Sequence, residues 1–87
     1  MADRERFYLC LAGVLRALRA ERGWSVSELS ERCGVGERTI RRLERGTNTG
    51  RVRADTVMRV AYGMGVTPCE VFRQVDERMG NKILFPH

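Results

Sequence analysis

The sequence predicts an all-α domain built from five helices. Three observations predict this fold: apolar residues recur at helical spacing in five segments, glycines mark the short breaks between them, and two segments open with residues suited to capping a helix. The expected helices cover residues 4–22, 26–33, 37–45, 54–64 and 68–78. With 87 residues the chain has room for one domain, which we expect over residues 1–78, followed by a tail at 79–87.

The first helix is predicted by a single apolar stripe. Its members fall at positions i, i+4, i+7, i+8 and i+11, so they lie on one helical face. They are Phe7, Leu11, Val14, Leu15 and Leu18. Gly23 follows the last turn and can adopt the left-handed conformation in which many helices end. We therefore expect a long first helix with one face in the core.

Two short helices follow. Ser25 and Glu28 have the spacing of a capping box, in which each side chain accepts a hydrogen bond from the other residue's backbone amide. Gly34 is expected to stop the second helix, and Gly46 the third.

The two short helices are joined by a tight turn, the Gly-Val-Gly sequence at residues 34–36. This turn is too tight for a sheet connection but suits two helices that meet at a steep angle. Ser30 is small at the point where the second short helix must approach the first. Inward-facing apolar residues are expected at Leu29, Cys33, Val35, Ile40 and Leu43. The pattern is typical of a helix-turn-helix, whose rigid corner leaves the start and outer face of its second helix free to enter a groove.

The last two helices combine apolar faces with favourable first turns. Asp55 lies in the first turn of the fourth helix, where the helix dipole favours negative charge. Thr67 and Glu70 again have capping-box spacing, with Pro68 at the first helical position. The expected apolar faces consist of Val57, Val60, Ala61 and Met64 in the fourth helix and Val71, Phe72 and Val75 in the fifth.

Positive charge is concentrated in the middle of the chain. The net charge is +5, and residues 32–59 contain eight arginines against three acidic residues, while cations and acids balance elsewhere. A local arginine cluster in a short chain is expected of a protein that binds a polyanion such as nucleic acid. Taken alone, the cluster fits a solvated surface equally well.

Metal binding, catalysis and membrane insertion are not expected. The three cysteines, Cys10, Cys33 and Cys69, lie far apart and the only histidine is His87, so a zinc site lacks ligands at usable spacing. We expect the cysteines to be buried small hydrophobes in a reducing cytosol. No catalytic set or phosphate-binding glycine loop occurs, so we expect neither an enzyme nor a cofactor. The longest apolar run is too short for a membrane span and lacks the features of a signal peptide.

Residues 11–72 resemble the phage-repressor and Cro type of helix-turn-helix, also called the xenobiotic-response-element (XRE) family. The resemblance rests on the capping box at Ser25 and on the motifs LRALR at 15–19, LS at 29–30, CGV at 33–35, TIRRLERG at 39–46 and VAYGMGV at 60–66. It implies a five-helix fold of the lambda-repressor type, with the helix-turn-helix formed by the second and third helices. In that family an arginine late in the first helix pairs with a glutamate that ends the third. Arg19 and Glu44 match these positions, so the resemblance implies that they form a structural pair.

The resemblance also implies which residues read bases. Family members use the first residues of the third helix and a residue one turn later, which match Glu37, Arg38 and Arg42, with Arg41 alongside. The chemistry suits this role, because arginine can donate two parallel hydrogen bonds to guanine and glutamate can accept one from cytosine. A contact to phosphate is the alternative for the arginines.

Contacts to the DNA backbone are expected from the start of the second helix. Ser25, Val26 and Ser27 can offer amides and hydroxyls to a phosphate. Further candidates are Gly36, Thr39, Arg45, Arg51 and Arg53, of which Thr39 could equally cap its own helix or face solvent. Arg51 and Arg53 belong to a loop that reaches the minor groove in some relatives, but here the loop is about two residues longer than usual. The chain also departs from the family at Val26, where glutamine is common, and at Gly36, which lacks a capping hydroxyl.

These observations predict a transcriptional regulator that binds double-stranded DNA. Since one module makes few base contacts, we expect a homodimer on an inverted repeat. We expect a cytoplasmic repressor from a bacterium or phage: a phage or mobile-element repressor, an antitoxin-type autoregulator or another small regulator, with a regulatory protein as a further candidate partner. The dimer contact is expected in the fifth helix with Ile83, Leu84 and Phe85, or at residues 7–10, although both segments could equally complete the core.

Two alternatives stay open. The departures at Val26 and Gly36 also fit a protein-interaction module that keeps the fold without reading bases. Trp24 is expected to cap the core, with stacking on a base as the alternative.

Overall fold

Five α-helices make up residues 3–46 and 52–80, the part of the chain that the structure, a computed structural model, describes; no strand occurs in these residues. The helices are α1 (Asp3–Glu21), α2 (Val26–Cys33), α3 (Glu37–Arg45), α4 (Ala54–Gly63) and α5 (Pro68–Arg78). The all-α, five-helix fold predicted from the sequence is confirmed. No described helix has the length and apolar character needed to cross a membrane.

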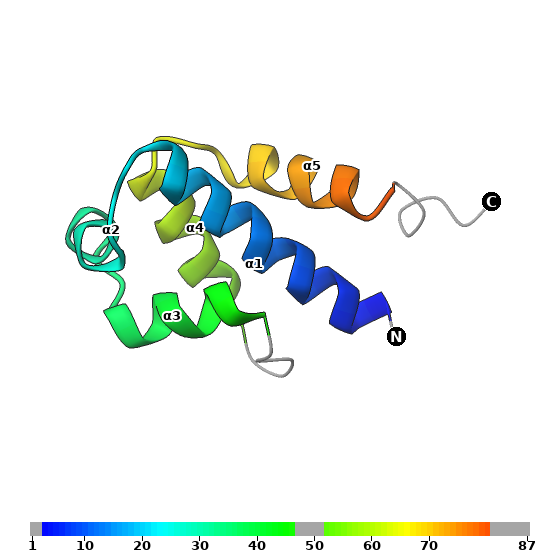
Figure 1. The fold of residues 1–87 in the computed structure, drawn as a ribbon, viewed down its shortest axis with the longest axis horizontal. Helices are drawn as coiled ribbons and strands as arrows, with labels where there is room; N and C mark the ends of the chain where they lie inside the picture. The colour runs from blue at the N-terminus through cyan, green and yellow to red at the C-terminus, as the bar shows by residue number, and fades with distance from the viewer. Residues whose placement is uncertain (1–2, 47–51, 81–87) are drawn as a thin grey trace.

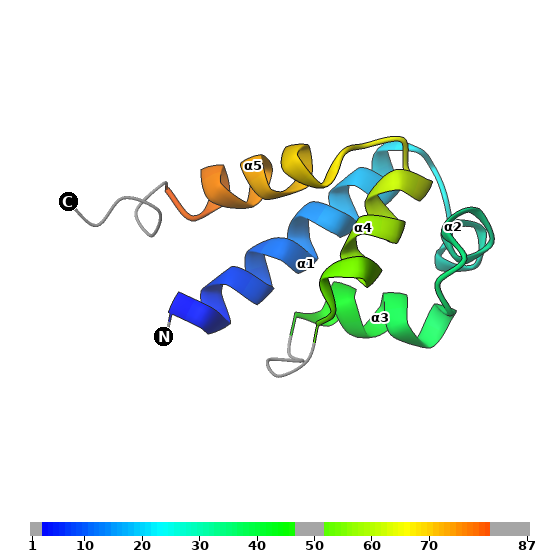
Figure 2. The ribbon, with the colours of Figure 1, turned by 180° about the vertical axis from the view of Figure 1, so that it is seen from behind.

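The long helix α1 is the centre of the arrangement. It contacts α3 on one side and α5 on another, while α2 contacts α3 and α4, and α4 contacts α5. α1 and α5 lie side by side and run in opposite directions, so the N-terminal end of α1 and the C-terminal end of α5 share one end of the molecule (Figures 1 and 2). α2 and the start of α3 lie at the opposite end, away from both termini.

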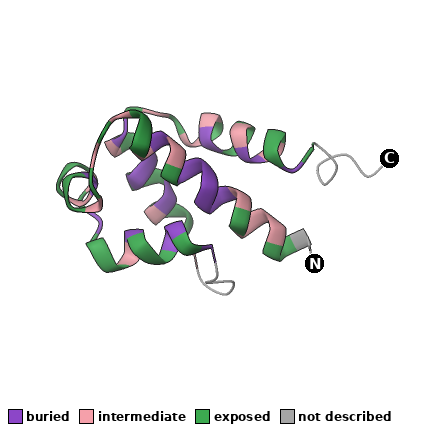
Figure 3. Cartoon of the chain, in the orientation of Figure 1, coloured by how far each residue is buried: buried purple, intermediate pink, exposed green. Residues whose placement is uncertain are grey.

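The core is assembled from the inward faces of all five helices (Figure 3). The largest fully buried side chains are Leu15, Leu29, Ile40, Val14, Val60, Val71 and Val75. They come from every helix, so α2 and α3 cannot fold as an isolated pair without exposing their apolar sides. Burying a side chain of this size stabilises a fold by about 1.5–3 kcal/mol relative to leaving it exposed.

Two glycines allow the turns around α3. Gly34, with φ of 71°, ends α2 in the left-handed region and donates its amide to the carbonyl of Ser30. Gly46, also with φ of 71°, ends α3. A Cβ at Gly46 would lie 3.1 Å from Leu9 Cα, so α3 meets α1 here with no room for a side chain.

Arg16 on α1 and Arg22, directly after this helix, hold the ends of two other helices, a feature that the sequence did not reveal. Arg16 donates to the carbonyl of Glu44 at the end of α3. Arg22 donates to the carbonyl of Met64, just after α4, over 2.8 Å. Carbonyls at a helix end lack partners within the helix, and cations are favourable there. These contacts therefore fix where α3 and α4 end relative to α1.

Two expectations about the burial of side chains need correction. The cysteines are not all buried: Cys69 is exposed, because it lies on the face of α5 opposite Val71, and Cys10 and Cys33 are half-buried. Phe72, expected on the apolar face of α5, is 41% exposed.

The capping box expected at the start of α5 is only half formed. The Thr67 hydroxyl accepts from the Glu70 amide at 3.1 Å. The Glu70 carboxylate, however, accepts from Arg73 and Gln74, which lie within reach one turn along the helix. These bonds replace the return contact to the Thr67 amide.

Candidate nucleic-acid interface

α3 separates apolar and basic residues sharply. Ile40, Leu43 and Glu44 are buried against the rest of the domain. The outer face carries the exposed arginines Arg38, Arg41, Arg42 and Arg45. Because α3 is held along its inner face, the four guanidinium groups project from a rigid support into solvent.

Only one of these four arginines has an acidic partner among the described residues. Arg41 Nη2 lies 3.1 Å from Glu37 Oε1, one turn earlier, and both side chains are exposed. Arg38, Arg42 and Arg45 have no ion pair within residues 3–46 and 52–80. Their charge is therefore available to an anionic partner without first breaking an ion pair among the described residues.

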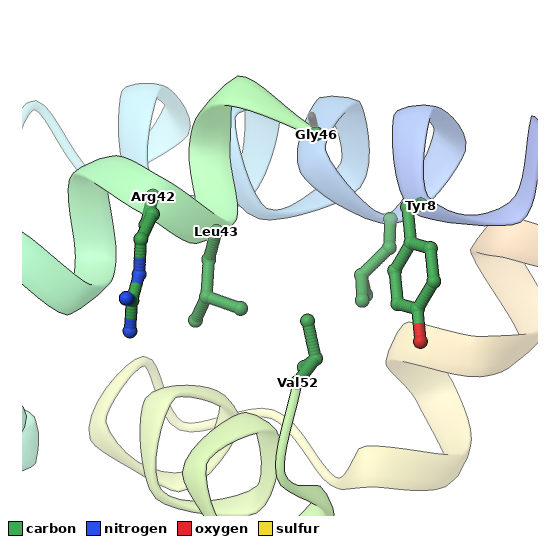
Figure 4. Close-up of a pocket in the computed structure, with 6 residues that line it drawn as sticks. Tyr8, Arg42, Leu43, Gly46 and Val52 are labelled. Atoms are coloured by element: carbon green, nitrogen blue, oxygen red, sulfur yellow. The ribbon is translucent and has the colours of Figure 1, made fainter. Parts of the chain in front are cut away.

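Arg42 is placed at the edge of a small apolar hollow next to α1. Figure 4 shows Arg42 and Leu43 extending from α3 in the same direction, with Val52 and Tyr8 farther along the hollow. The hollow has a volume of about 10 Å³, room for no more than a single water molecule. Arg42 therefore lines this hollow while the residue as a whole is exposed.

Arg19 and Glu44 join the two ends of the helix-turn-helix to α1. The Glu44 carboxylate accepts from Arg19 Nε and Nη2, each over 2.8 Å, in a bidentate pair. Arg19 Nη1 also donates to the carbonyl of Trp24 at 2.9 Å, just before α2 begins. One guanidinium therefore contacts both the entry to α2 and the end of α3.

The environment of this pair favours its charged form. The Glu44 side chain is 9% exposed and that of Arg19 22%, so water competes little for the contact. The hydrogen bond to Glu44 is the main reason that the pKa of Arg19 is raised. Two charge-assisted bonds in fixed geometry orient α3 more strictly than apolar packing alone.

The N-terminus of α2 forms the predicted capping box. Ser25 Oγ accepts from the Glu28 amide at 3.0 Å, and Glu28 Oε1 accepts from the Ser25 amide at 3.1 Å. The bond from the Ser25 backbone is the main reason that the pKa of Glu28 is lowered. Because the Glu28 carboxylate already accepts from the Ser25 amide, the amides of Val26 and Ser27 are the donors of the first turn that lack an acceptor within the helix.

The turn between α2 and α3 is held by Ser30. Its hydroxyl donates to the carbonyl of Val35 over 2.7 Å, bridging the corner. The sequence indicated only that Ser30 is small, but its hydroxyl also fixes the turn. Gly36 is the N-cap residue of α3 and provides no side-chain hydrogen bond to the first turn. Thr39, in that turn, is half-buried.

The remaining sequence candidates lie around this unit. Arg53 precedes α4 and makes a two-point contact with Asp55, with distances of 3.1 and 3.3 Å. Arg51 lies outside the described residues. Trp24 packs against the core, and the guanidinium of Arg32 lies 4.1 Å from the centre of its ring. That face of Trp24 is covered and cannot stack on a base.

Comparison with known proteins agrees with this geometry. The family model described as a helix-turn-helix domain matches residues 11–73, more than half of the chain. A protein of Pyrococcus furiosus, named as an inferred HTH-type transcriptional regulatory protein, is 32% identical over 83 residues that cover 91% of this chain. The chain spans only 26% of that relative's length. No solved structure gives a significant match. With its tight corner between α2 and α3 and the match over residues 11–73, the chain belongs to the helix-turn-helix domain family.

Proposed function

We propose that the protein is a transcriptional regulator that binds double-stranded DNA in a sequence-specific manner, with α3 in the major groove. The observation that carries this proposal is the row of exposed arginines on α3 without acidic partners among the described residues, on a helix anchored through Glu44. A cluster of exposed arginines on one rigid face favours an anionic ligand of regular shape. The name of the Pyrococcus furiosus relative supports the same role.

Base reading is assigned to the start and outer face of α3. Arg38 and Arg42 are four residues apart, so they share one helical face and can contact neighbouring base pairs. Each can donate two hydrogen bonds to a guanine. Arg41 is held by Glu37 in the free protein, so these two residues contact bases only if DNA separates or reorients the pair.

Backbone contacts are assigned to the flanks of α3. The amides of Val26 and Ser27, at the N-terminus of α2, can donate to the oxygens of a phosphate. The Ser25 hydroxyl, which accepts from the Glu28 amide, can still donate its own proton. Arg45 and Thr39, on α3, and Arg53, before α4, are the side-chain candidates; Gly36 contributes its backbone. Such contacts fix the register of the protein on the duplex and carry no sequence information directly.

We further propose that a homodimer binds an inverted repeat and acts as a repressor. A symmetric dimer places two copies of α3 about one helical turn of DNA apart, which doubles the number of base contacts. Near the N-terminus of α1, Leu9 is 42% exposed, while Phe7, Tyr8 and Cys10 are half-buried against the core. Candidate dimer contacts are this surface and α5 together with Ile83, Leu84 and Phe85, three residues that lie outside the described part of the chain. A regulatory protein partner is a further candidate.

The matched variants Arg42→Ala and Arg45→Ala test direct base reading, since each removes one exposed guanidinium that has no ion pair among the described residues. On the preferred duplex we expect Arg42→Ala to cost about 1–3 kcal/mol and to relax the preference at one position in each half-site. Arg45→Ala should weaken binding to every duplex alike and lower the salt dependence by about one phosphate contact.

An Arg42→Ala variant that loses the same affinity on all sequences would contradict direct reading. No binding to any duplex at low salt, by protein that circular dichroism shows to be folded, would favour the protein-interaction module instead.

A further inference from the structure

Ser30 makes a hydrogen bond across the corner between α2 and α3. Its hydroxyl donates to the carbonyl of Val35, five residues later, over 2.7 Å. A serine inside a helix that bonds to the backbone usually contacts the carbonyl one turn earlier in its own helix. Ser30 instead reaches past the end of α2 at Cys33 to the residue before the N-cap of α3. The bond therefore joins two helices and does not serve one helix alone.

The start of α3 lacks the side-chain cap that α2 and α5 have. The hydroxyls of Ser25 and Thr67 accept amides in the first turns of α2 and α5. The N-cap of α3 is Gly36, which has no side chain to accept a hydrogen bond from the first turn. An uncapped first turn is held less firmly, because its amides lack partners within the helix. The bond from Ser30 to the Val35 carbonyl holds the chain directly before this uncapped turn.

The opposite end of α3 is anchored by Glu44 and can act as a pivot. Arg19 on α1 binds the Glu44 carboxylate through two hydrogen bonds of 2.8 Å. Arg38 lies six residues before Glu44, about 9 Å along the helix axis. A rotation of roughly 10° about the anchored end would move Arg38 by about 1.6 Å. Hydrogen-bond lengths vary by only about 0.5 Å, so this rotation would break a two-point contact with guanine.

Apolar packing alone does not prevent such a rotation. Ile40, one turn into α3, is buried in the core. The hydrophobic effect is not directional, so this contact resists separation of the helices more than it resists a small rotation. The bond from Ser30 to Val35 has a defined direction and acts at the corner itself.

We propose that Ser30 is a positioning residue for base reading, and that its hydroxyl sets the direction in which α3 leaves the corner. Through this bond the first residues of α3, including Arg38, keep a fixed place relative to the amides at the start of α2. Contacts to bases and to phosphates can then form in one register, without DNA first having to order the corner. This role rests on the proposed binding of DNA by α3.

The variant Ser30→Ala removes the hydroxyl and little else. Alanine favours a helix more than serine does, which offsets part of the lost hydrogen bond, so the melting temperature should change by less than about 5 °C. Because DNA must then order the corner on binding, we expect the affinity for the duplex that the wild type prefers to fall about fivefold. The affinity for a shuffled duplex of the same length should change less than about twofold, because contacts to phosphates alone tolerate rotation of α3.

A control and a second-site variant separate positioning from general effects of mutation. Glu31, exposed on α2 next to Ser30, gives the control Glu31→Ala, which should leave the ratio of the two affinities unchanged. A Cβ at Gly36 would have no heavy atom within 4 Å outside the neighbouring residues, and a φ of −61° with a ψ of 148° suits any residue. Gly36→Ser should therefore supply the missing cap, and in the Ser30→Ala background it should return the ratio to within about twofold of the wild-type value.

Amide hydrogen exchange tests the same role without DNA. The Ile40 amide donates to the Gly36 carbonyl over 3.1 Å in the first turn of α3, and the Val71 amide makes the equivalent bond to Thr67 in α5 over 3.2 Å. Ser30→Ala should speed exchange at Ile40 about fivefold and at Val71 less than about twofold. A loss of stability of the whole domain would instead speed exchange at both amides alike.

A Ser30→Ala variant that discriminates between the two duplexes as well as the wild type does would overturn this role, while the proposed function would stand. Equal acceleration of exchange at Ile40 and Val71, or no recovery of the ratio by Gly36→Ser, would also overturn it. A wild-type protein that binds both duplexes equally would contradict the proposed function and this role together. A lower ratio in Ser30→Ala that Gly36→Ser restores, with faster exchange at Ile40 alone, would support it.

Discussion

Replacing Glu44 by alanine removes the side-chain ion pair between α3 and α1. The carboxylate is almost fully buried and accepts two bonds of 2.8 Å from Arg19. The variant leaves the Arg19 guanidinium with its bond to the Trp24 carbonyl and no neutralising charge. Arg19 cannot move fully into water, because its side chain is only 22% exposed.

The expected cost follows from these contacts. Leaving a fully buried charge without its partner costs about 3–5 kcal/mol, and hydrogen bonds to charged groups contribute about 1.5–3 kcal/mol. Since Arg19 retains one bond and some hydration, we expect Glu44→Ala to lower the free energy of unfolding by about 2–3 kcal/mol. In a domain of this size, the melting temperature should fall by about 8–24 °C.

Thermal unfolding followed by circular dichroism measures this effect. Glu77→Ala is the control, because Glu77 forms an exposed pair with Arg73, which keeps its second partner Glu70. An exposed pair of this kind contributes little to stability, so the melting temperature should shift by less than about 4 °C. A double-mutant cycle with Arg19→Ala should give a coupling energy of at least about 1 kcal/mol. If Glu44→Ala melts at the same temperature as Glu77→Ala, the anchoring role of Glu44 is wrong.

Three further predictions test other parts of the molecule. Asp55→Asn should release Arg53 and raise DNA affinity up to about fivefold in a binding titration, and unchanged affinity would place Arg53 away from DNA. Gly63→Ala should lower the free energy of unfolding, measured in urea, by about 1–3 kcal/mol, because the added Cβ would lie 2.8 Å from Cys33 Cα. This loss is expected even though alanine usually favours a helix more than glycine does. A neutral or stabilising result would show that α2 and α4 can separate. Hydrogen bonds, chiefly from Arg73, lower the pKa of Glu70 from 4.5 to about 2, so its contribution to stability is complete above pH 4.5 and is lost as the pH falls toward 2. Melting temperatures of Glu70→Gln should therefore change less than those of the wild type between pH 5 and pH 2.5, and equal changes would contradict this assignment.

The helices and their ends were predictable because local chemistry determines them. The capping box at Ser25 and the left-handed Gly34 and Gly46 act over three or four residues, so their spacing is visible in the sequence. The inward positions Leu29 and Ile40 follow from helical periodicity in the same way. The position of the corner between α2 and α3 could therefore be predicted without a structure.

Contacts between distant residues were not predictable from spacing. The bond from Arg16 to the Glu44 carbonyl and that from Arg22 to Met64 depend on how whole helices pack, and an arginine on a helix surface gives no sign of its partner. The exposed fraction of Phe72 likewise depends on how α1 packs against α5.

The candidate site was predicted unevenly for the same reason. The exposed face of α3 follows from its periodicity. That Glu37 holds Arg41 while Arg38 and Arg42 have no acidic partner among the described residues depends on side-chain conformations. The sequence therefore indicated the basic face, and the structure distinguished the arginines on it.

Selection of bound duplexes from a random library at near-physiological salt tests the central claim most directly, namely that α3 reads bases through Arg38 and Arg42. We expect the wild-type protein to enrich an inverted repeat with guanine in each half-site, and the Arg38→Ala/Arg42→Ala variant to lose this motif while remaining folded. No enriched motif from folded wild-type protein, or the same motif from the variant, would contradict the claim.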